Sequence, residues 1–594
     1  MRFLGRVLVF AVCGAISGGA SGAEASPVVP GLHGEHPLNE RQVGAVLIEE
    51  LRCASCHDGM NRFGLKMAPD LSGVGSRLQP EYLKKFVADP SGMHPGTTMP
   101  NVFGAVSEEE RRKAVESISH YLLSLREDVP APSEDAADED GRTLFHELGC
   151  VACHSPRDDD GKELWGEGVI TLGHVPGKFR PGALADFLHH PLKVRPSGRM
   201  PDMHLSREEA AALAGFLEGQ GKEAVAEPPV PTAAQVPAGK QAFRRYDCTA
   251  CHDVGNSGAP SLPSGPPLDE LDVTGGCLSP EPGQAPDFHL SDDQRAAIRA
   301  ALNGVSEPAT ADAQIKMRLT QLNCIACHER DGYGGVAEKR DSYFHTTEEA
   351  LGNEARIPPP LTLVGAKLRP EWMNKVLYDR EMIRPYMKAR MPHYGEPALD
   401  GLPGLFGQVD KMEEVVLEPP TRQNGTKLRN GAHLLLGTDG LGCIACHNYN
   451  GKESPGMKGL DLMTTYQRLQ PAWFYNYMKN PAAFRPGITM PSYWPGGQAV
   501  QPDILDGDTH EQLRALWHNF SLGRSARDPK GLVTEDTRLV VTDTVRTYRG
   551  RSRVAGFRGI AVGYPAGLNY AFNAQNGSLA AVWRGEFVRV NWRS

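Results

Sequence analysis

The chain has 594 residues, of which 40% are hydrophobic and 23% are charged, and its formal net charge is −9. This length exceeds what one hydrophobic core supports, so several domains are expected. The apolar fraction excludes a disordered chain, and the negative charge argues against nucleic acid as the main partner.

The first 23 residues have the pattern of a secretory signal peptide. Arg2 and Arg6 flank the start of the apolar run VLVFAVCGAI, and small residues follow through Ala23. The run is too short to span a bilayer, and no other stretch approaches the needed length. We therefore expect an exported, periplasmic protein without a transmembrane segment in the mature chain. Association with a membrane complex is left open.

Ten of the 12 cysteines fall into five identical Cys-x-x-Cys-His frames. The frames are Cys53, Cys56 and His57; Cys150, Cys153 and His154; Cys248, Cys251 and His252; Cys324, Cys327 and His328; and Cys443, Cys446 and His447. This frame is the attachment signature of c-type haem. Two thiols one helical turn apart each form a thioether to a haem vinyl group, and the adjacent imidazole reaches the iron.

Other cysteine chemistry explains these frames less well. A zinc site has no reason to place a histidine directly after every second cysteine. A thioredoxin-like redox motif occurs once, within a βαβ pattern, and a disulfide across two intervening residues is a poor structural link. The five frames therefore predict five covalently attached haem c groups and their iron atoms.

The same order of elements is expected around the motifs. A helix-like segment precedes a motif, as in 141–149, 239–247, 315–323 and 431–442. A loop and an amphipathic helix follow it, as in 69–91, 359–379 and 460–481. Most units then reach a Met-Pro pair and close with a polar-capped helix, such as 107–126 or 206–221.

Each such unit resembles a class I cytochrome c domain, and the resemblance covers roughly residues 40–524. In that family a methionine in a Met-Pro loop is the distal iron ligand. The resemblance implies that Met99, Met200, Met391 and Met490 have this role. A neutral thioether favours reduced iron and raises its potential.

The third unit departs from this pattern. Residues 283–291 align with 198–206, but Ala285 stands where the earlier copy has Met200. Alanine cannot ligate iron, so the haem of the third motif is expected to be completed differently or left open. Cys277 is a candidate thiolate ligand that would lower the potential, and His289 is a second candidate. The alternative is an inert, buried Cys277 beside an open or water-bound haem.

The residues after Gly523 change in character. Runs of β-branched and aromatic residues over 537–550 and 559–590 predict strands, and Asn576-Gly577 predicts a hairpin turn. This segment resembles, more weakly, a β segment found beside haem domains in multihaem cytochromes of the planctomycete and verrucomicrobial type.

The expected fold is mainly α, with five tandem cytochrome c-like domains and a small C-terminal β module. The expected boundaries are a signal peptide over 1–23, haem domains over 24–132, 133–224, 225–305, 306–420 and 421–524, and a β-rich module over 525–594. Segments 133–141, 224–239 and 415–425 are expected to be linkers, because they are acidic or rich in proline.

The leading functional hypothesis is a periplasmic pentahaem cytochrome that relays electrons between redox partner proteins through four His/Met haems and one atypical haem. Two alternatives stay open. One is an oxidoreductase, for example of sulfur compounds, with the third haem as its active site. The other is a sensor that binds a gas at an open haem. Whether the chain is an enzyme is left undecided.

Overall fold

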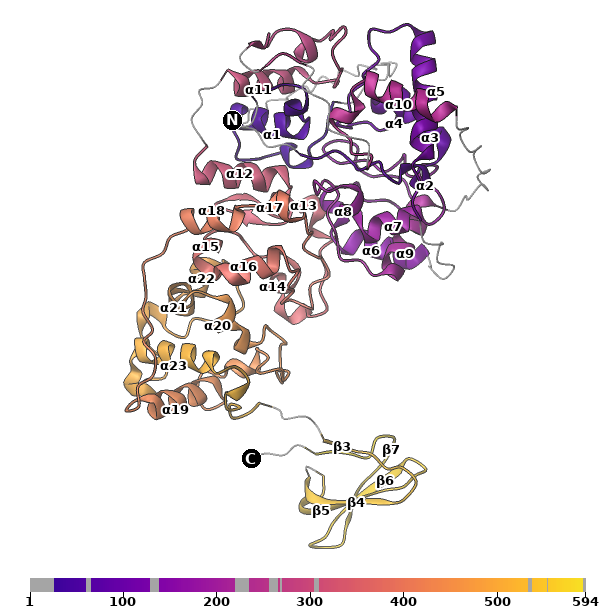
Figure 1. Cartoon of the computed structure of the whole chain (residues 1–594). Coiled ribbons are helices and arrows are strands. Elements are labelled where there is room, and N and C mark those ends of the chain that lie inside the picture. Colours follow the sequence, from indigo (N-terminus) through magenta and orange to yellow (C-terminus); the bar gives the residue numbers. More distant parts are fainter. Residues whose placement is uncertain are drawn as a thin grey trace, which may run out of the picture. The chain divides into compact units, whose positions relative to one another are not determined.

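The computed structural model describes residues 26–59, 66–128, 138–219, 234–255, 265–267, 270–303, 309–532, 537–552 and 554–590. The expected signal peptide over 1–23 lies outside the described residues. The described chain is mainly helical and carries a small sheet near its C-terminus (Figure 1), which confirms the coarse prediction of fold class. Among the described residues, no helix is long and apolar enough to cross a membrane.

The chain divides into two compact bodies. The N-terminal body contains the described residues of Met1–Ala326 together with Met391–Ala398, and the C-terminal body contains those of Cys327–Arg390 and Leu399–Ser594.

Three helix pairs form the frame of the N-terminal body. Helix α1 (Glu40–Glu50) packs against α11 (Asp292–Leu302), and α10 (Gln235–Arg245) packs against α5 (Glu108–Ser124). Helix α6 (Asp138–Glu147) packs against α9 (Arg207–Glu218). Between them lie the shorter helices α3 (Pro80–Ala88), α4 (Pro90–Met93), α7 (Ala183–His189) and α8 (Pro191–Val194), and α12 (Ala311–Gln321) follows α11.

These pairs correct the expected domain order. The helix before the first motif, α1, packs on α11, which closes the expected third domain. The helix before the third motif, α10, packs on α5, which closes the expected first domain. The ranges 24–132 and 225–305 are therefore not two separate units. The chain is nested instead: residues 66–128 and 234–255 form a unit inserted into the first one, and residues 138–219 are inserted into that second unit in turn.

Glycines allow the helix pairs that define this nesting. A Cβ atom added at Gly44 of α1 would overlap the carbonyl oxygen of Ala297 in α11. A Cβ atom added at Gly239 of α10 would overlap the carbonyl oxygen of Ser117 in α5. The helix axes approach so closely only because these positions carry no side chain.

A buried charge cluster ties the nested segments together. Glu50 is 3% exposed, and its carboxylate accepts bonds from Lys66 Nζ at 2.6 Å and from Arg199 Nε at 2.8 Å. Gln321 Nε2 donates to the same carboxylate at 3.0 Å. Burial alone would raise the pKa of Glu50, but Lys66 and Arg199 outweigh burial and lower it to about 2.

The C-terminal body has a large apolar core of its own. Helix α19 (Gly425–Leu436) packs on α23 (Thr509–Ser521), and α15 (Val364–Lys367) and α16 (Pro370–Leu377) pack on α18 (Leu402–Val409). Helices α20 (Thr465–Arg468) and α21 (Pro471–Lys479) complete the core around the fully buried Trp494. The indole Nε1 of Trp494 donates to Gln512 Oε1 at 2.9 Å, which satisfies its only polar atom.

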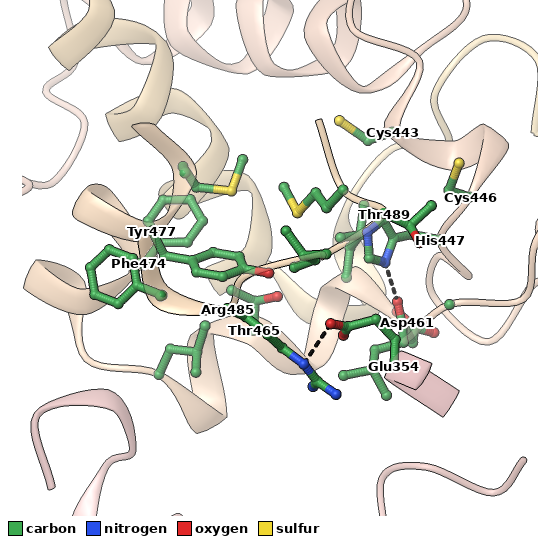
Figure 2. A pocket seen from close by; sticks show the side chains of 18 of the residues that line it. Glu354, Cys443, Cys446, His447, Asp461, Thr465, Phe474, Tyr477, Arg485 and Thr489 are labelled. Carbon is green, nitrogen blue, oxygen red and sulfur yellow. Dashed lines mark hydrogen bonds and ion pairs between the residues drawn. The ribbon is translucent and has the colours of Figure 1, made fainter. Parts of the chain in front are cut away.

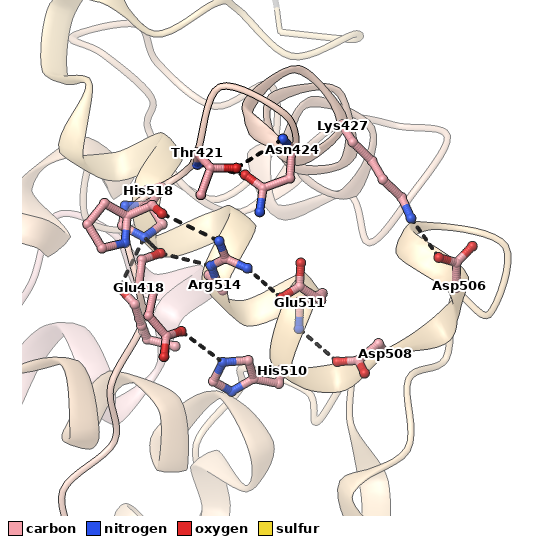
Figure 3. A network of polar contacts seen from close by, with 12 residues as sticks. Glu418, Thr421, Asn424, Lys427, Asp506, Asp508, His510, Glu511, Arg514 and His518 are labelled. Atoms are coloured by element: carbon pink, nitrogen blue, oxygen red, sulfur yellow. Dashed lines mark hydrogen bonds and ion pairs between the residues drawn. The ribbon is translucent and has the colours of Figure 1, made fainter.

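Of the expected linkers, residues 133–137 and 224–233 lie outside the described residues, and the described remainder belongs to helices or contacts one. Helix α6 takes in residues from Asp138 onward and α10 those from Gln235 onward. Segment 415–425 is bound to α23 (Figure 3), where Arg514 Nε donates to the Glu418 carbonyl at 2.8 Å. His518 Nε2 contacts the same carbonyl at 2.6 Å, so segment 415–425 is held against helix α23.

The C-terminal module contains two sheets of antiparallel strands, one of four strands and one of two. Strands β4 (Arg546–Ser552), β5 (Gly556–Gly563), β6 (Leu568–Asn573) and β7 (Leu579–Arg584) pair in sequence order, and β3 (Thr537–Leu539) pairs with β8 (Val588–Val590). Asn576 and Gly577 lie in the turn between β6 and β7, where Gly577 has a φ of 71°. The predicted hairpin is confirmed.

Substituting Gly239 with alanine should destabilise the N-terminal body, although alanine normally favours a helix by about 1 kcal/mol. The added methyl group must push α10 away from α5, and overpacking of this kind costs about 1–3 kcal/mol. Denaturant unfolding followed by circular dichroism measures the change. Gly407→Ala in α18 is the matched control, because nothing lies within 4 Å of its added Cβ. Equal effects of the two substitutions would contradict the proposed role of the close contact.

Removing the Asp410 carboxylate should destabilise the C-terminal body by about 3–5 kcal/mol, because Arg330 would stay buried without its partner. Their side chains are 1% and 3% exposed and lie 2.8 Å apart. The free energy of unfolding of Asp410→Ala tests this. The control is Asp439→Ala, which breaks an exposed pair with Lys530 and should cost no more than about 1 kcal/mol.

Candidate functional site

The five motif histidines share one hydrogen bond. In each case the ring Nδ1 contacts a backbone carbonyl oxygen. The pairs are His57 with Pro266 at 2.8 Å, His154 with Ile170 at 2.9 Å, His252 with Pro69 at 2.9 Å, His328 with Pro359 at 2.7 Å and His447 with Leu460 at 3.0 Å. Because a carbonyl only accepts, each Nδ1 carries the proton and each Nε2 keeps its lone pair for a metal.

The backbone of the motifs also repeats. The first three residues of every motif form a 3-10 turn, and the residue before it is left-handed. These residues are Arg52, Gly149, Asp247, Asn323 and Gly442. None of the described cysteines forms a disulfide.

Burial keeps the imidazoles in the neutral form that binds a metal. It lowers the pKa of His154, His252, His328 and His447. A neutral ring with its Nε2 unprotonated is the ligand form of histidine.

The fifth motif lines a large apolar cavity in the C-terminal body. Cys443, Cys446, His447 and Met490 all border it. Figure 2 shows the two cysteines and the histidine at one side of the view, with Phe474 and Tyr477 at the other. Two thiols, one imidazole and one thioether around an apolar space are the groups that a covalent haem requires, so the residues fit this cofactor.

A second cavity, in the N-terminal body, is shared by two motifs. Cys150 and His154 of the second motif line it together with Cys248 and His252 of the third. Met99 and Met200 line the same cavity, whereas Cys53, Cys56 and His57 do not. The two sites are therefore continuous with each other.

The helix pairs assign the two methionines to their motifs. Met99 precedes α5, which packs on α10, the helix that leads into the third motif. Met200 precedes α9, which packs on α6, the helix that leads into the second motif. The expectation that Met99 serves the first motif is thus corrected, because Met99 lies with the third.

The loop that carries Ala285 in place of a methionine accompanies the first motif. Ala285 lies before α11, which packs on α1, the helix that leads into Cys53. Burial, with the Cys56 thiol adding to it, raises the pKa of Cys277 to about 11, and the Cys277 thiol in turn adds to the raised pKa of Cys53. Ala285 and Cys277 therefore accompany the first motif rather than the third.

His289 repeats the conformation of His204. Both have left-handed backbones, with φ of 52° and 57°, and both Nδ1 atoms lie near an aspartate two residues earlier, at 3.4 Å from Asp287 and 3.5 Å from Asp202. Since His204 stands beside Met200, this arrangement is a feature of the loop. It does not single out His289 as a replacement ligand.

Met391 belongs to the N-terminal body, is 41% exposed and lines neither of these two cavities. Its loop exchanges two backbone hydrogen bonds with the Met200 loop, between Asp202 and His393, both at 2.9 Å. His328 belongs to the C-terminal body. The assignment of Met391 to the fourth motif stays a prediction.

Sequence reasoning missed a set of half-buried or buried cations that line the two cavities. Lys178 and Arg195 line the cavity of the N-terminal body, and Lys367, Arg384 and Arg468 line that of the C-terminal body. Burial, reinforced by neighbouring arginines, lowers the pKa of Lys178 and of Lys367 to about 7. The repeated Lys-x-Arg-Pro sequences at 178–181 and 367–370 are a signal that could have drawn attention to them.

Comparison of the chain with protein-family models, with curated proteins and with solved structures finds no significant match. Among the described residues, no group of three or more His, Cys, Asp or Glu side chains is arranged to hold a metal ion on its own. A haem iron needs only one or two ligands from the protein, because the porphyrin supplies four.

Proposed function

We propose that this protein is a periplasmic pentahaem c-type cytochrome that passes electrons between redox partner proteins. One observation carries the proposal: five Cys-x-x-Cys-His turns share one backbone conformation, and in each the histidine Nδ1 is bound to a carbonyl. A repeated geometry that directs Nε2 toward a metal is what five proximal haem ligands require.

The cysteines, histidines and methionines have separate proposed roles. The two cysteines of each motif hold the cofactor covalently, and the histidine supplies the proximal ligand in a fixed tautomer. Met99, Met200, Met391 and Met490 are the proposed distal ligands of the third, second, fourth and fifth haems. Haem iron supplies a one-electron couple, in which one iron goes from Fe(II) to Fe(III) as the next is reduced.

The first haem is the proposed atypical one. Ala285 takes the place of a distal methionine beside the first motif, and Cys277 lies close to the motif cysteines. This observation favours a second candidate function, in which the first haem binds a small ligand or substrate and the other four serve it with electrons. A thiolate from Cys277 would instead close the site and lower its potential.

The chain produced with a c-type haem maturation system should carry five covalent haems, measured by intact mass and by total haem. Carbon monoxide should bind to about one haem in five of the fully reduced protein. No binding would mean that all five irons are six-coordinate and would remove the second candidate function. A haem count below five would contradict the pentahaem proposal itself.

Ala285→Met should abolish carbon monoxide binding, because the new thioether closes the first haem. Met99→Ala should raise it from one haem to two by opening the third. Optical titration of the reduced protein measures both stoichiometries. Met382→Ala is the control, since this methionine is 62% exposed and outside every Met-Pro loop. Unchanged binding in Ala285→Met would sink the assignment of Ala285 to a distal position.

A further inference from the structure

One exchange of hydrogen bonds occurs twice in the chain. In the N-terminal body, residues 77–79 run antiparallel to residues 178–180, and in the C-terminal body, residues 468–470 run antiparallel to residues 367–369. In the N-terminal body, the backbone N–H of Gln79 donates to the Lys178 carbonyl and that of Arg180 to the Arg77 carbonyl, both at 2.9 Å. In the C-terminal body, Gln470 donates in the same way to Lys367 at 2.9 Å, and Arg369 to Arg468 at 2.8 Å.

The side chains repeat as faithfully as the backbone. Arg180 Nε donates to the Leu78 carbonyl at 3.1 Å, and Arg369 Nε donates to the Leu469 carbonyl at 3.0 Å. Gln79 Nε2 donates to the Phe179 carbonyl at 2.9 Å, as Gln470 Nε2 does to that of Leu368 at 2.9 Å. The two contacts are therefore the same interface built twice.

The sequences that form this interface are repeated too. One side is Arg-Leu-Gln-Pro, at 77–80 and 468–471, and the other is Lys-x-Arg-Pro, at 178–181 and 367–370. The histidine contacts show which motif each sequence accompanies. Arg-Leu-Gln-Pro accompanies the third motif at 77–80, through the contact of Pro69, and the fifth at 468–471, through that of Leu460. Lys-x-Arg-Pro accompanies the second motif at 178–181, through the contact of Ile170, and the fourth at 367–370, through that of Pro359. The residues 265–303 that accompany the first motif contain neither sequence.

In each interface a lysine reaches into the neighbouring unit. Lys178 Nζ lies 5.5 Å from the ring centre of Tyr82, and Lys367 Nζ lies 4.8 Å from that of Trp473. Tyr82 and Trp473 occupy the same position, the third residue of the helix that begins at the proline of Arg-Leu-Gln-Pro. Each lysine thus stands where two units meet.

These half-buried lysines form an excess of positive charge along the two cavities. A second cation accompanies each of them, Arg195 for Lys178 and Arg384 for Lys367, and both arginines precede a proline in the approach to a Met-Pro pair. No carboxylate among the described residues lies within ion-pair distance of these four side chains. Partly desolvated cations that line an apolar cavity favour an anionic partner, so the cavities are suited to carboxylate groups of a ligand.

We propose that the chain contains two equivalent dihaem modules, one formed by the second and third haems and the other by the fourth and fifth. In each module the cavity-lining lysine and its arginine bind the propionate carboxylates of the haems, and the repeated interface holds the two units together. This inference rests on the proposed function, because it takes the cofactor as haem. The first haem lies outside both modules.

A positive charge beside a haem favours the reduced iron, so removing it should lower the potential of both haems in that module and of no others. Spectroelectrochemical titration of the five-haem protein resolves one-electron components. Lys178→Gln should shift two of the five, with a threefold to tenfold lower equilibrium constant for reduction, about 30–60 mV at 59 mV for each factor of ten. Lys367→Gln should shift two different components.

The double variant should shift four components, and the one left unshifted should be the haem that binds carbon monoxide. Lys178→Arg and Lys367→Arg keep the charge and should restore most of the potential, which separates the charge from any loss of packing. Lys113→Gln and Lys530→Gln are exposed controls that should move no component.

A shift of a single component, a shift spread over all five, or a shift no larger than that of the controls would overturn the module proposal. The proposed function is tested separately by the haem count of the same samples. Five haems with unpaired shifts would reject the modules alone, whereas a protein without covalent haem would reject the function beneath them.

Discussion

The N-terminal body depends on the crossing of paired helices at glycine. The helices that lead into the first, second and third motifs each bury an apolar face against a closing helix, and Gly44 and Gly239 let two of these pairs approach to backbone contact. The partner of α1 is α11 and the partner of α10 is α5. Once those partners are set, residues 66–255 must form an insertion within the first unit. The buried Glu50, held by Lys66 and Arg199, joins the same nested segments at their centre.

The nesting has consequences for the site, because it decides which methionine or alanine loop accompanies which motif. Met99 is closest in sequence to the first motif, yet its loop leads into the helix that supports the third. Ala285 follows the third motif in sequence, yet its loop leads into the helix that supports the first. The loop with alanine in place of methionine thereby accompanies the motif nearest the beginning of the chain. The second and third motifs, in contrast, share one cavity and the cations that line it.

Much of the local structure could be predicted from the sequence. The Cys-x-x-Cys-His frames correspond to five equal turns, and the turn at Asn576-Gly577 joins two strands as its residue types require. Capped helices begin at Ser107 and Ser206 as their polar residues indicate. Segment 415–425 was less predictable. Its prolines suggest a spacer, but Arg514 and His518 on α23 bind its carbonyls, and these partners lie about a hundred residues away.

By itself the sequence determined the chemistry that each short stretch can perform: five thiol pairs with an adjacent imidazole, four Met-Pro loops and one loop with alanine. Only the tertiary structure decided how these pieces combine. The reason is physical. The units are repeats with nearly the same apolar pattern, so the hydrophobic effect rewards any leading helix that packs on any closing helix. The choice falls to side-chain fit between distant residues, such as Gly239 against Ser117 and Gly44 against Ala297, and to buried charges such as Glu50 that only one arrangement satisfies.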